Sequence, residues 1–416
     1  MRQRGWLAAV IIAVSVLSLT ACTGDTSSNN ASPAKSDLPP LSFSKQPLWT
    51  SDNHPDLRYL DDVAVKSDSV ITLDVLDDTL AVFDAATGKL RWQVKQHAKL
   101  PGVSGRYANL SDAHSVITAG DGDDWTLLVP YTSDCTPECD SYDANPEFGV
   151  AAYAGRSGKL RWTAPIAHKS DHLGKEVLPL AANPKMVVSV VGSIAVDDPT
   201  KQPVVVATSM SDGKKLWQSK GMWPQQIVGD TVLGARGKSQ PDPARPLGTG
   251  TPDAMPLVGS GDTVVALNAN NGTKKWESHG GVGLVLANDK IAVVEEQNKV
   301  RAVDIETGKE LADFGERESC GGNGVKFVVC LSLDEMVVYD VATNRSTKHN
   351  DLPATHLNLV FGDYIVVYNN VLDRDGKKVA GSDIPAVDAM SDQYAATVSK
   401  DANQRTTLRV YGVKIG

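Results

Sequence analysis

Hydrophobic and polar positions alternate in short runs along most of this chain. The pattern is regular at 283–314, where four β-rich runs (GLVLA, KIAVVE, KVRAVD and ELADF) follow one another. Turn-forming pairs such as Asn288-Asp289 and Thr307-Gly308 separate the runs. Because such residues supply positive φ angles or local side-chain caps, this stretch predicts four antiparallel strands joined by hairpins. We call the strands of one such unit A to D, in chain order.

A short phrase recurs at the end of four of these units. Each copy has a glycine four residues before a tryptophan: Gly88 and Trp92, Gly158 and Trp162, Gly213 and Trp217, Gly272 and Trp276. Weaker copies follow around Gly308, Asn344 and Gly376, so neighbouring copies lie between 32 (344 to 376) and 70 (88 to 158) residues apart. A repeat of about 35–45 residues with four short strands is typical of a β-propeller blade, and the longer intervals predict blades with insertions.

The phrase also predicts how neighbouring blades dock. Its glycine falls in the turn between strands C and D, and its tryptophan falls at the start of strand D, the outermost strand. An indole at that place can bury a large area against the adjacent blade. We therefore expect the four glycine–tryptophan pairs, together with Trp49, to be blade-docking residues.

Trp49 makes the count of blades eight. The C-terminal segment TLRVYGVKIG supplies a strand C that lacks a strand D, and KQPLWTS around Trp49 supplies a strand D that lacks a blade. Pairing the two segments closes the ring and removes an exposed sheet edge. A seven-bladed ring with a spare C-terminal strand is the alternative, but it leaves Trp49 without a role.

The repeated phrase, at its best in Asp84, Gly88, Lys89 and Trp92, resembles the tryptophan-docking motif of the PQQ-like, quinoprotein-type propellers. The resemblance covers about residues 46–416. It implies an all-β fold, an eight-bladed β-propeller of four-stranded antiparallel blades, closed by an N-terminal strand that completes the last blade. Ala312 stands where the fifth copy should have tryptophan, and Asn344 stands where the sixth should have glycine. The later blades should therefore dock differently.

The N-terminus is typical of an exported protein. Arg2 and Arg4 precede an apolar stretch at 6–19, which is shorter than the roughly 20 residues of a membrane-spanning helix. The stretch ends in Leu-Thr-Ala-Cys22, which resembles a bacterial lipobox. That resemblance implies cleavage before Cys22 and acylation of its thiol and new amino group, for instance with palmitate. An ordinary signal peptide followed by a chance cysteine is the alternative.

These features divide the chain into three parts. Residues 1–21 are expected to be a lipoprotein signal peptide, and residues 46–416 the PQQ-like propeller. Residues 22–45 are rich in Ser, Asn, Asp and Pro and read as a flexible tether, because such a composition cannot bury a core. The acyl chains would then anchor the propeller on a membrane surface.

The other four cysteines fit an oxidising compartment. Sequence proximity favours the disulfides Cys135–Cys139 and Cys320–Cys330 over crossed pairings. Half of a metal site is the competing interpretation of the C-x3-C spacing at 135–139, although no second pair of matching spacing accompanies it.

Charge narrows the range of partners. The net charge is −9, and loss of Arg2 and Arg4 with the signal peptide makes it −11. With no Lys/Arg cluster among aromatic residues, nucleic acid is not an expected partner. Because an acidic protein does not adsorb to anionic lipid, attachment to the membrane must come from the lipid anchor.

The sequence offers little chemistry. We expect no catalytic residues, no metal site and no cofactor. The quinoprotein dehydrogenases that the resemblance brings in carry adjacent cysteines beside quinone and calcium, and this chain has none that are adjacent. Four further candidates have simpler explanations as turns or loops: the acidic stretches Asp121–Asp124 and Asp373–Gly376, the phosphate-loop imitation at 237–239, and the His168/His172 pair.

Insertions are the remaining feature. Segments at 131–147, 195–203 and 234–260 each separate a strand B from a strand C in blades two, three and four. Connections between B and C all emerge on the face that also carries the connections from one blade to the next. The three insertions therefore predict a raised binding rim, because binding residues concentrate on loops held by a rigid scaffold. Tolerated variation in surface loops is the alternative.

The sequence thus predicts a bacterial, lipid-anchored, extracytoplasmic propeller that acts as a non-catalytic protein-binding scaffold. It resembles the propeller lipoproteins of the outer-membrane barrel assembly machinery in fold and anchoring. The anchored face would be that of the outer membrane in a Gram-negative cell, or of the plasma membrane in a Gram-positive one. A ligand-sensing propeller and a quinone-dependent oxidoreductase are the alternative functions.

Overall fold

The structure, a computed structural model, describes residues 36–51, 60–74, 79–95, 98–100, 106–108, 117–120, 122–133, 147–168, 177–191, 203–236, 263–278, 282–296, 299–317, 319–322, 326–332, 335–350, 357, 359–367, 370–379, 387–401 and 405–416. Its contacts divide the chain into two compact units, Met1–Ala34 and Lys35–Gly416. The first unit lies outside the described residues, so the fold given below is that of the second.

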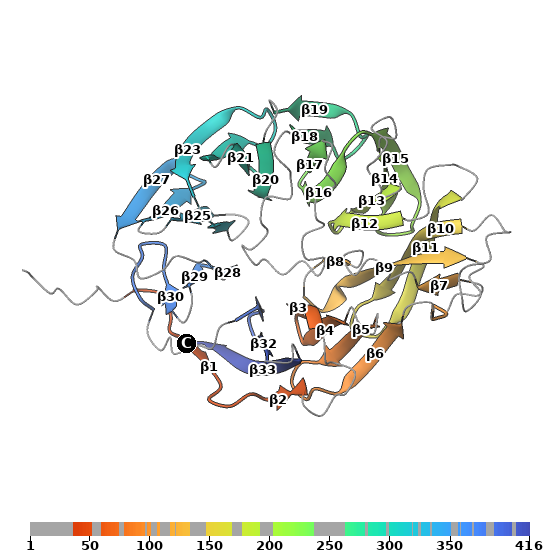
Figure 1. Cartoon of the computed structure of the whole chain (residues 1–416), viewed down its shortest axis with the longest axis horizontal. Coiled ribbons are helices and arrows are strands. Elements are labelled where there is room, and N and C mark those ends of the chain that lie inside the picture. Colours follow the sequence, from red (N-terminus) through yellow and green to blue (C-terminus); the bar gives the residue numbers. More distant parts are fainter. Residues whose placement is uncertain are drawn as a thin grey trace, which may run out of the picture. The chain divides into compact units, whose positions relative to one another are not determined.

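Eight antiparallel sheets follow one another around a ring, and the chain passes through them in sequence order (Figure 1). The first four blades are β3 (Leu60–Lys66), β4 (Ser69–Asp74), β5 (Thr79–Asp84) and β6 (Leu90–Lys95); β7 (Arg106–Ala108) and β8 (Ile117–Ala119) on β9 (Thr126–Ser133), β10 (Glu147–Ala154) and β11 (Lys159–His168); β12 (Val177–Ala182), β13 (Met186–Val191), β14 (Val204–Ser209) and β15 (Lys215–Lys220); and β16 (Trp223–Val228), β17 (Thr231–Arg236), β18 (Thr263–Asn268) and β19 (Lys274–Glu277).

The remaining blades complete the ring. They are β20 (Val282–Ala287), β21 (Ile291–Glu296), β22 (Lys299–Asp304) and β23 (Glu310–Glu316); β24 (Ser319–Gly322), β25 (Phe327–Leu331), β26 (Glu335–Asp340) and β27 (Arg345–Asn350); β28 (Leu359–Phe361), β29 (Tyr364–Val367) and β30 (Asn370–Leu372); and β31 (Ala389–Met390), β32 (Tyr394–Lys400) and β33 (Thr406–Ile415) with β1 (Leu41–Phe43) and β2 (Trp49–Thr50). The predicted eight-bladed fold is confirmed, and the seven-bladed alternative is wrong.

Local turn chemistry sets the strand boundaries. In blade 5 the Asn288 carboxamide oxygen accepts hydrogen bonds from the backbone N–H groups of Lys290 and Ile291, at 3.0 and 2.9 Å. This cap turns the chain between β20 and β21. The four strands of this blade match the predicted runs to within two residues at each end. Blade 7 departs from the four-strand pattern: its described residues form three strands, and a single bridge from Leu372 to Lys378 stands where strand D would begin.

Tryptophan locks join five successive pairs of blades. In each lock the indole of one blade covers the turn glycine of the next, and its N–H donates to the carbonyl three residues before that glycine at 2.5–2.9 Å. A Cβ on any of these glycines would come within 2.6–2.9 Å of the indole, and each glycine has a positive φ near 70°. Glycine is therefore required on both counts. The locks are Trp49–Gly88, Trp92–Gly158, Trp162–Gly213, Trp217–Gly272 and Trp276–Gly308.

The N-terminal segment closes the ring with two strands. Trp49 in β2 pairs with Val410 of β33, and Leu41 in β1 pairs with Ile415 of the same strand. The boundary between tether and propeller, expected at residue 46, is therefore wrong. Residues 36–45, the last ten of the predicted tether, belong to the propeller. Leu41 is fully buried between blades 7 and 8, and the Tyr364 hydroxyl donates to the Pro39 carbonyl at 3.0 Å. A polar average composition concealed this one buried leucine.

The hydrophobic core lies between blades, in separate clusters of alternating strand residues. Along β21, for example, Val293 faces blade 6 while Val294 faces blade 4. Each blade is thus stabilised mainly by its two neighbours. The stability of the ring therefore depends on the contacts at each boundary between blades, which we call a seam.

Candidate partner-binding face

The connections between strands B and C differ greatly in length around the ring. Three consecutive blades, 2 to 4, have long connections between the ends of their described strands, whereas the others have short ones. The long connections hold 13 residues (134–146), 12 residues (192–203) and 26 residues (237–262), and the short ones hold 4 (75–78), 2 (297–298), 3 (332–334), 2 (368–369) and 5 (401–405). The insertions are thus concentrated in one arc.

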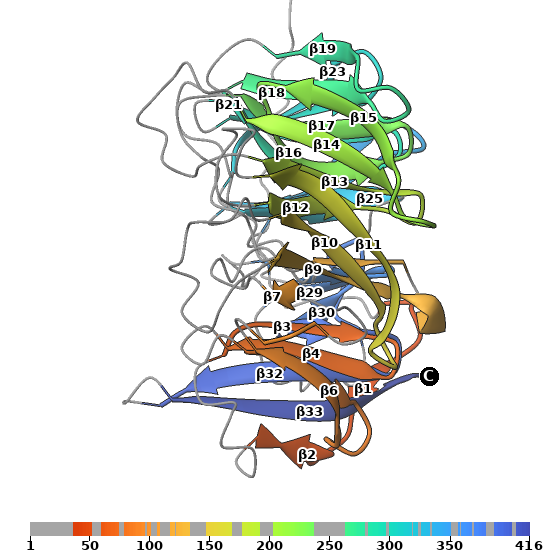
Figure 2. The same ribbon diagram turned by 90° about the vertical axis from the view of Figure 1, so that its right-hand side faces the viewer.

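The three long connections leave from a single face. In blade 2, strand C begins at Glu147 and its other end leads into the turn at Gly158, and blades 3 and 4 follow the same order. We call the side on which strands B end and strands C begin the B–C face; the turn glycines lie on the opposite side of the ring (Figure 2). The interior of each long connection, 134–146, 192–202 and 237–262, lies outside the described residues.

The described strands run further toward this face than the sequence indicated. Residues 131–133 belong to β9, residue 147 belongs to β10, and residues 234–236 belong to β17. The expected insertion boundaries at 131–147 and 234–260 are corrected accordingly. Tyr131 is almost fully buried, so the hydrophobic alternation of strand B continues past the predicted loop start.

In blade 2 an arginine fastens the base of the long connection. The Arg106 Nε donates to a Glu147 carboxylate oxygen at 2.9 Å, and its Nη1 donates to the Thr163 hydroxyl at 3.0 Å. The guanidinium also lies 4.9 Å from the ring centre of Tyr131, whose hydroxyl donates to the same Glu147 oxygen at 2.7 Å. Burial, with the neighbouring Glu147, raises the pKa of the Tyr131 phenol, so this hydroxyl stays a donor. The cluster ties β7, β9, β10 and β11 together.

Gly149 makes room for this cluster. A Cβ there would lie 2.6 Å from the Tyr131 ring and 2.2 Å from the carbonyl oxygen of Ala164. Any side chain would therefore displace the tyrosine or the adjacent strand. The close approach of the two strands explains the glycine, since its own φ is not in the left-handed region.

Blade 4 repeats the arrangement with different residues. Arg236, the last residue of β17, donates from Nη1 to a Glu277 carboxylate oxygen at 3.0 Å and from Nε to the Gly221 carbonyl at 2.7 Å. Lys274 donates to the other Glu277 oxygen at 2.8 Å, and this bond, with the charge of Arg236, lowers the pKa of Glu277. A serine accepts a backbone hydrogen bond beside each clamp: Ser133 from Glu147, and Ser278 from Val264.

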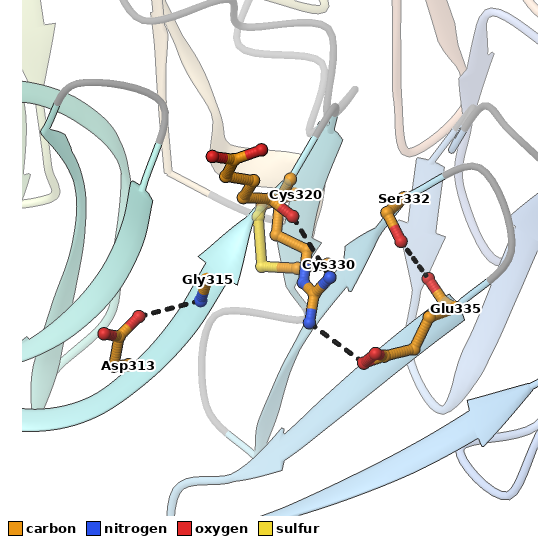
Figure 3. The surroundings of a disulfide bond; sticks show 8 residues. Asp313, Gly315, Cys320, Cys330, Ser332 and Glu335 are labelled. Carbon is orange, nitrogen blue, oxygen red and sulfur yellow. Dashed lines mark hydrogen bonds and ion pairs between the residues drawn. A yellow bond between two sulfur atoms is a disulfide. The ribbon is translucent and has the colours of Figure 1, made fainter.

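A third pair lies on the same face in blade 6. The Arg317 side chain, only 8% exposed, donates to Glu335 at 3.0 Å at the crossing from blade 5 to blade 6. Beside it, a disulfide joins Cys320 and Cys330, which face each other directly across β24 and β25 (Figure 3). This is the pairing that sequence proximity favours. Cys135 and Cys139 lie outside the described residues, as does the proposed lipidation site at Cys22.

Sequence reasoning missed these arginine–glutamate pairs. In both blade 2 and blade 4 the partners are 41 residues apart in the chain. Neither the arginine nor the glutamate of a pair stands out in the sequence. The two side chains meet only because the strands around the insertion pair with each other. An arginine at the B–C end of one strand and a glutamate at the same end of the next strand but one in the sheet is the signal that could have found them.

The acidic turns and the histidine pair, where the structure describes them, have structural roles. The Asp373 carboxylate accepts hydrogen bonds from the backbone N–H groups of Asp375 and Lys377, both at 2.9 Å, so Asp373–Gly376 is a capped turn. Asp124, in the short 3₁₀ turn Gly122–Asp124, pairs with Arg161. His168 ends β11, and His172 lies outside the described part of the chain.

The features of a calcium site were sought in the part of the chain that the structure describes. No three His, Cys, Asp or Glu side chains gather there closely enough to hold a metal ion. The cysteines that are joined in blade 6 are separated by ten positions rather than being adjacent. Within the same described ranges, no helix has the length and apolarity needed to cross a membrane.

Comparison with known proteins finds one family model and several solved structures to which the chain is similar. The family model described as outer membrane protein assembly factor BamB matches residues 146–319. Similar solved structures include BamB from Moraxella catarrhalis, with 14% identity, a TM-score of 0.43, and coverage of 85% of this chain and 97% of that chain. Another is the quinohemoprotein alcohol dehydrogenase from Comamonas testosteroni, with 10% identity, a TM-score of 0.47, and coverage of 91% and 78%. No curated protein sequence matches the chain. With its eight sheets, the chain is an eight-bladed propeller, and residues 146–319 are similar to the BamB family model.

Proposed function

We propose that this chain is a lipid-anchored, extracytoplasmic scaffold that binds a protein partner through the B–C face of blades 2 to 4. The observation that carries the proposal is the concentration of long connections on one face of three consecutive blades. Loops on a rigid support are where binding residues usually occur. The proposal needs no catalytic group, in keeping with the structural roles found for the candidate residues.

The arginine–glutamate pairs at the bases of two long connections prepare the proposed face for binding. The Arg106–Glu147 and Arg236–Glu277 pairs are charge-assisted hydrogen bonds that hold one end of each of two long connections in place, at Glu147 and at Arg236. Fixing the end of a loop before binding lowers the conformational entropy that binding must remove. A Cys135–Cys139 disulfide, if formed, would restrict the first connection further.

Two further considerations support a protein partner and an envelope location. The matching family model is described as an outer membrane protein assembly factor, and such a factor works on other proteins. The basic, apolar and Cys22-containing N-terminus supports export and lipid attachment. On these grounds we place the protein on the extracytoplasmic face of a bacterial membrane, the outer membrane in a Gram-negative cell.

Site-specific photo-crosslinking in living cells tests the proposal. A photoreactive residue is placed at Gln240, within the connection 237–262, and at Asn270 in the turn of the same blade as the matched control. We expect a protein adduct from position 240 that disappears when residues 237–262 are replaced by a short turn, while the melting temperature stays nearly unchanged.

Two outcomes would overturn it. Equal adducts from both positions, or normal capture by the shortened protein, would remove the B–C face as the binding surface. A bound chromophore after addition of pyrroloquinoline quinone and calcium would instead favour a quinone-dependent oxidoreductase.

A further inference from the structure

The seam between blades 5 and 6 lacks the lock that joins the preceding blades. Ala312 occupies the place of the docking tryptophan, and Asn344 occupies the place of the turn glycine. Asn344 has a φ of 53°, close to that of the glycines it replaces. The turn is therefore preserved, and what is missing is the indole.

The two departures have one physical cause. In the five locked seams the glycine is needed because a Cβ would come within 2.6–2.9 Å of the indole. With Ala312 in place of the indole, a side chain fits at position 344. The Asn344 carboxamide accepts a hydrogen bond from the Tyr339 hydroxyl at 2.9 Å, which is a bond within its own blade.

What remains at this seam is the Arg317–Glu335 ion pair where the chain crosses between the two blades, together with non-directional packing. Phe314 of blade 5 meets Tyr339 edge-on, with ring centres 5.6 Å apart, inside a cluster that includes Val293 and the two joined cysteines. Inner strand β24 has four residues, two of them glycine, and the disulfide fixes it to β25. The disulfide keeps blade 6 intact but does not reach blade 5.

The two following seams are held in other ways. Between blades 6 and 7 the His349 ring lies 3.4 Å from where a Cβ of Gly376 would be, and its buried Nε2 makes no hydrogen bond. Lys326 and Asp363 add an ion pair at 2.7 Å across that seam. Between blades 7 and 8 the buried Leu41 fills the contact.

We infer that the ring opens at the seam between blades 5 and 6. Blades 8, 1, 2, 3, 4 and 5, joined by five tryptophan locks, then form one stiff arc. Opening next to blade 5 leaves that arc undisturbed, because each blade contacts only its neighbours. On the proposed function, the consequence is that the partner-binding blades 2 to 4 stay preorganised while the ring flexes elsewhere.

Adjacent residues of β21 provide a matched test. Val293 is fully buried and faces the seam with blade 6, whereas Val294 is 4% exposed and faces the locked seam with blade 4. Val293→Cys and Val294→Cys are labelled with iodoacetamide in the native, disulfide-intact protein, and modification is followed by peptide mass spectrometry. We expect the thiol at position 293 to react about tenfold faster or more, because native-state opening sets the rate.

Installing the missing lock provides the second arm. Ala312→Trp combined with Asn344→Gly should slow labelling at position 293 by about tenfold and leave position 294 unchanged, whereas Ala312→Trp alone should not, since the Asn344 Cβ blocks the indole. Equal rates at the two positions, or faster labelling at 294, would overturn the inference. If the double variant fails to fold, the comparison of 293 with 294 decides by itself. Neither arm depends on a binding partner, so the result is separate from the fate of the proposed function.

Discussion

The docking indole of one blade and the turn glycine of the next blade form one contact that joins the two blades. The Trp92 N–H donates to the Gly155 carbonyl at 2.7 Å while its ring covers Gly158. The neighbouring Arg91 lies at the register shift opposite Val82 and Phe83, where no residue of β5 is its Cα partner. Its guanidinium donates hydrogen bonds to Asp68 and Asp84. The repeated phrase thus encodes a contact between blades rather than a feature within one.

Removing an indole should be costly. We expect Trp92→Ala to lower the free energy of unfolding by about 3 kcal/mol, the lower end for aromatic truncations, because the partly buried indole leaves a cavity and an unpaired carbonyl. Leu90→Ala on the same strand is the matched control, since Leu90 is 39% exposed and should change stability by less than about 0.5 kcal/mol. Urea denaturation measures both. A loss below about 1 kcal/mol for Trp92→Ala would contradict the role of the lock.

Glu295 predicts a pH dependence of stability. Burial raises the pKa of this carboxyl above its ordinary value of 4.5, so the folded state favours the protonated form. That contribution is fully present below the ordinary pKa and is lost as pH rises through the folded one. Glu295→Gln should therefore be more stable than the natural protein at neutral pH, and equally stable in acid, in unfolding measurements across this range.

Asp68 is the control of opposite sign. Its hydrogen bond to Arg91 lowers the pKa of Asp68, so its contribution is present above the ordinary pKa and is lost as pH falls through the folded one. Asp68→Asn should be less stable than the natural protein at neutral pH, and the difference should shrink in acid. The same trend for both variants would show that the two carboxyls are not in the environments described.

At the scale of elements, the N-terminal segment secures three blades. Its residues 36–51 bond blade 7 through Pro39, fill the contact between blades 7 and 8 with Leu41, and lock blade 8 to blade 1 through Trp49. Ser51 adds a hydrogen bond from the Leu408 N–H at 2.9 Å. A segment of polar average composition therefore supplies the outermost strand, strand D, of blade 8.

Deleting residues 36–50 should open the last blade. Strand β33 would lose its partners on that side and present an unpaired edge, which favours association with other chains. We expect a lower melting temperature and oligomers in size-exclusion chromatography. Deletion of 23–35, the part of the predicted tether before this segment, is the matched control and should change neither. Equal melting temperatures for the two deletions would refute the closure role of β1 and β2.

The whole molecule combines a ring of unequal seams with loops concentrated in one arc. Five locks stiffen the arc that includes blades 2 to 4, and the long connections belong to those blades. Rigid support and long connections thus coincide, which is the arrangement expected of a scaffold that presents a fixed surface. The net charge of −9 makes anionic lipid an unfavourable contact for the chain as a whole.

Attachment through Cys22 is testable in cells. We expect Cys22→Ser to leave the protein unprocessed or to release it to the soluble fraction, because neither thiol acylation nor the lipoprotein cleavage can follow. Cell fractionation and the mass of the mature N-terminus measure the outcome, with Ser27→Ala as the control. A Cys22→Ser protein that is still cleaved and still in the membrane fraction would exclude the anchor.

The sequence by itself determined the repeat, the number of blades, and the strands of blade 5 to within two residues, because these depend on short-range turn chemistry and on alternation. It also located Trp49, since a docking phrase without a blade demands a partner. Local periodicity carries no information about which distant residues meet. The arginine–glutamate clamps, with partners 41 residues apart, follow from how strands pair around an insertion.

Only the tertiary structure decided the remaining points. Leu41 is buried because blades 7 and 8 enclose it, and nothing in the polar stretch around it indicates so. The departures at Ala312 and Asn344, which look independent in sequence, are the two sides of one missing contact. The sequence specifies each blade through neighbours in the chain, whereas the strength of each seam depends on which side chains face each other in space.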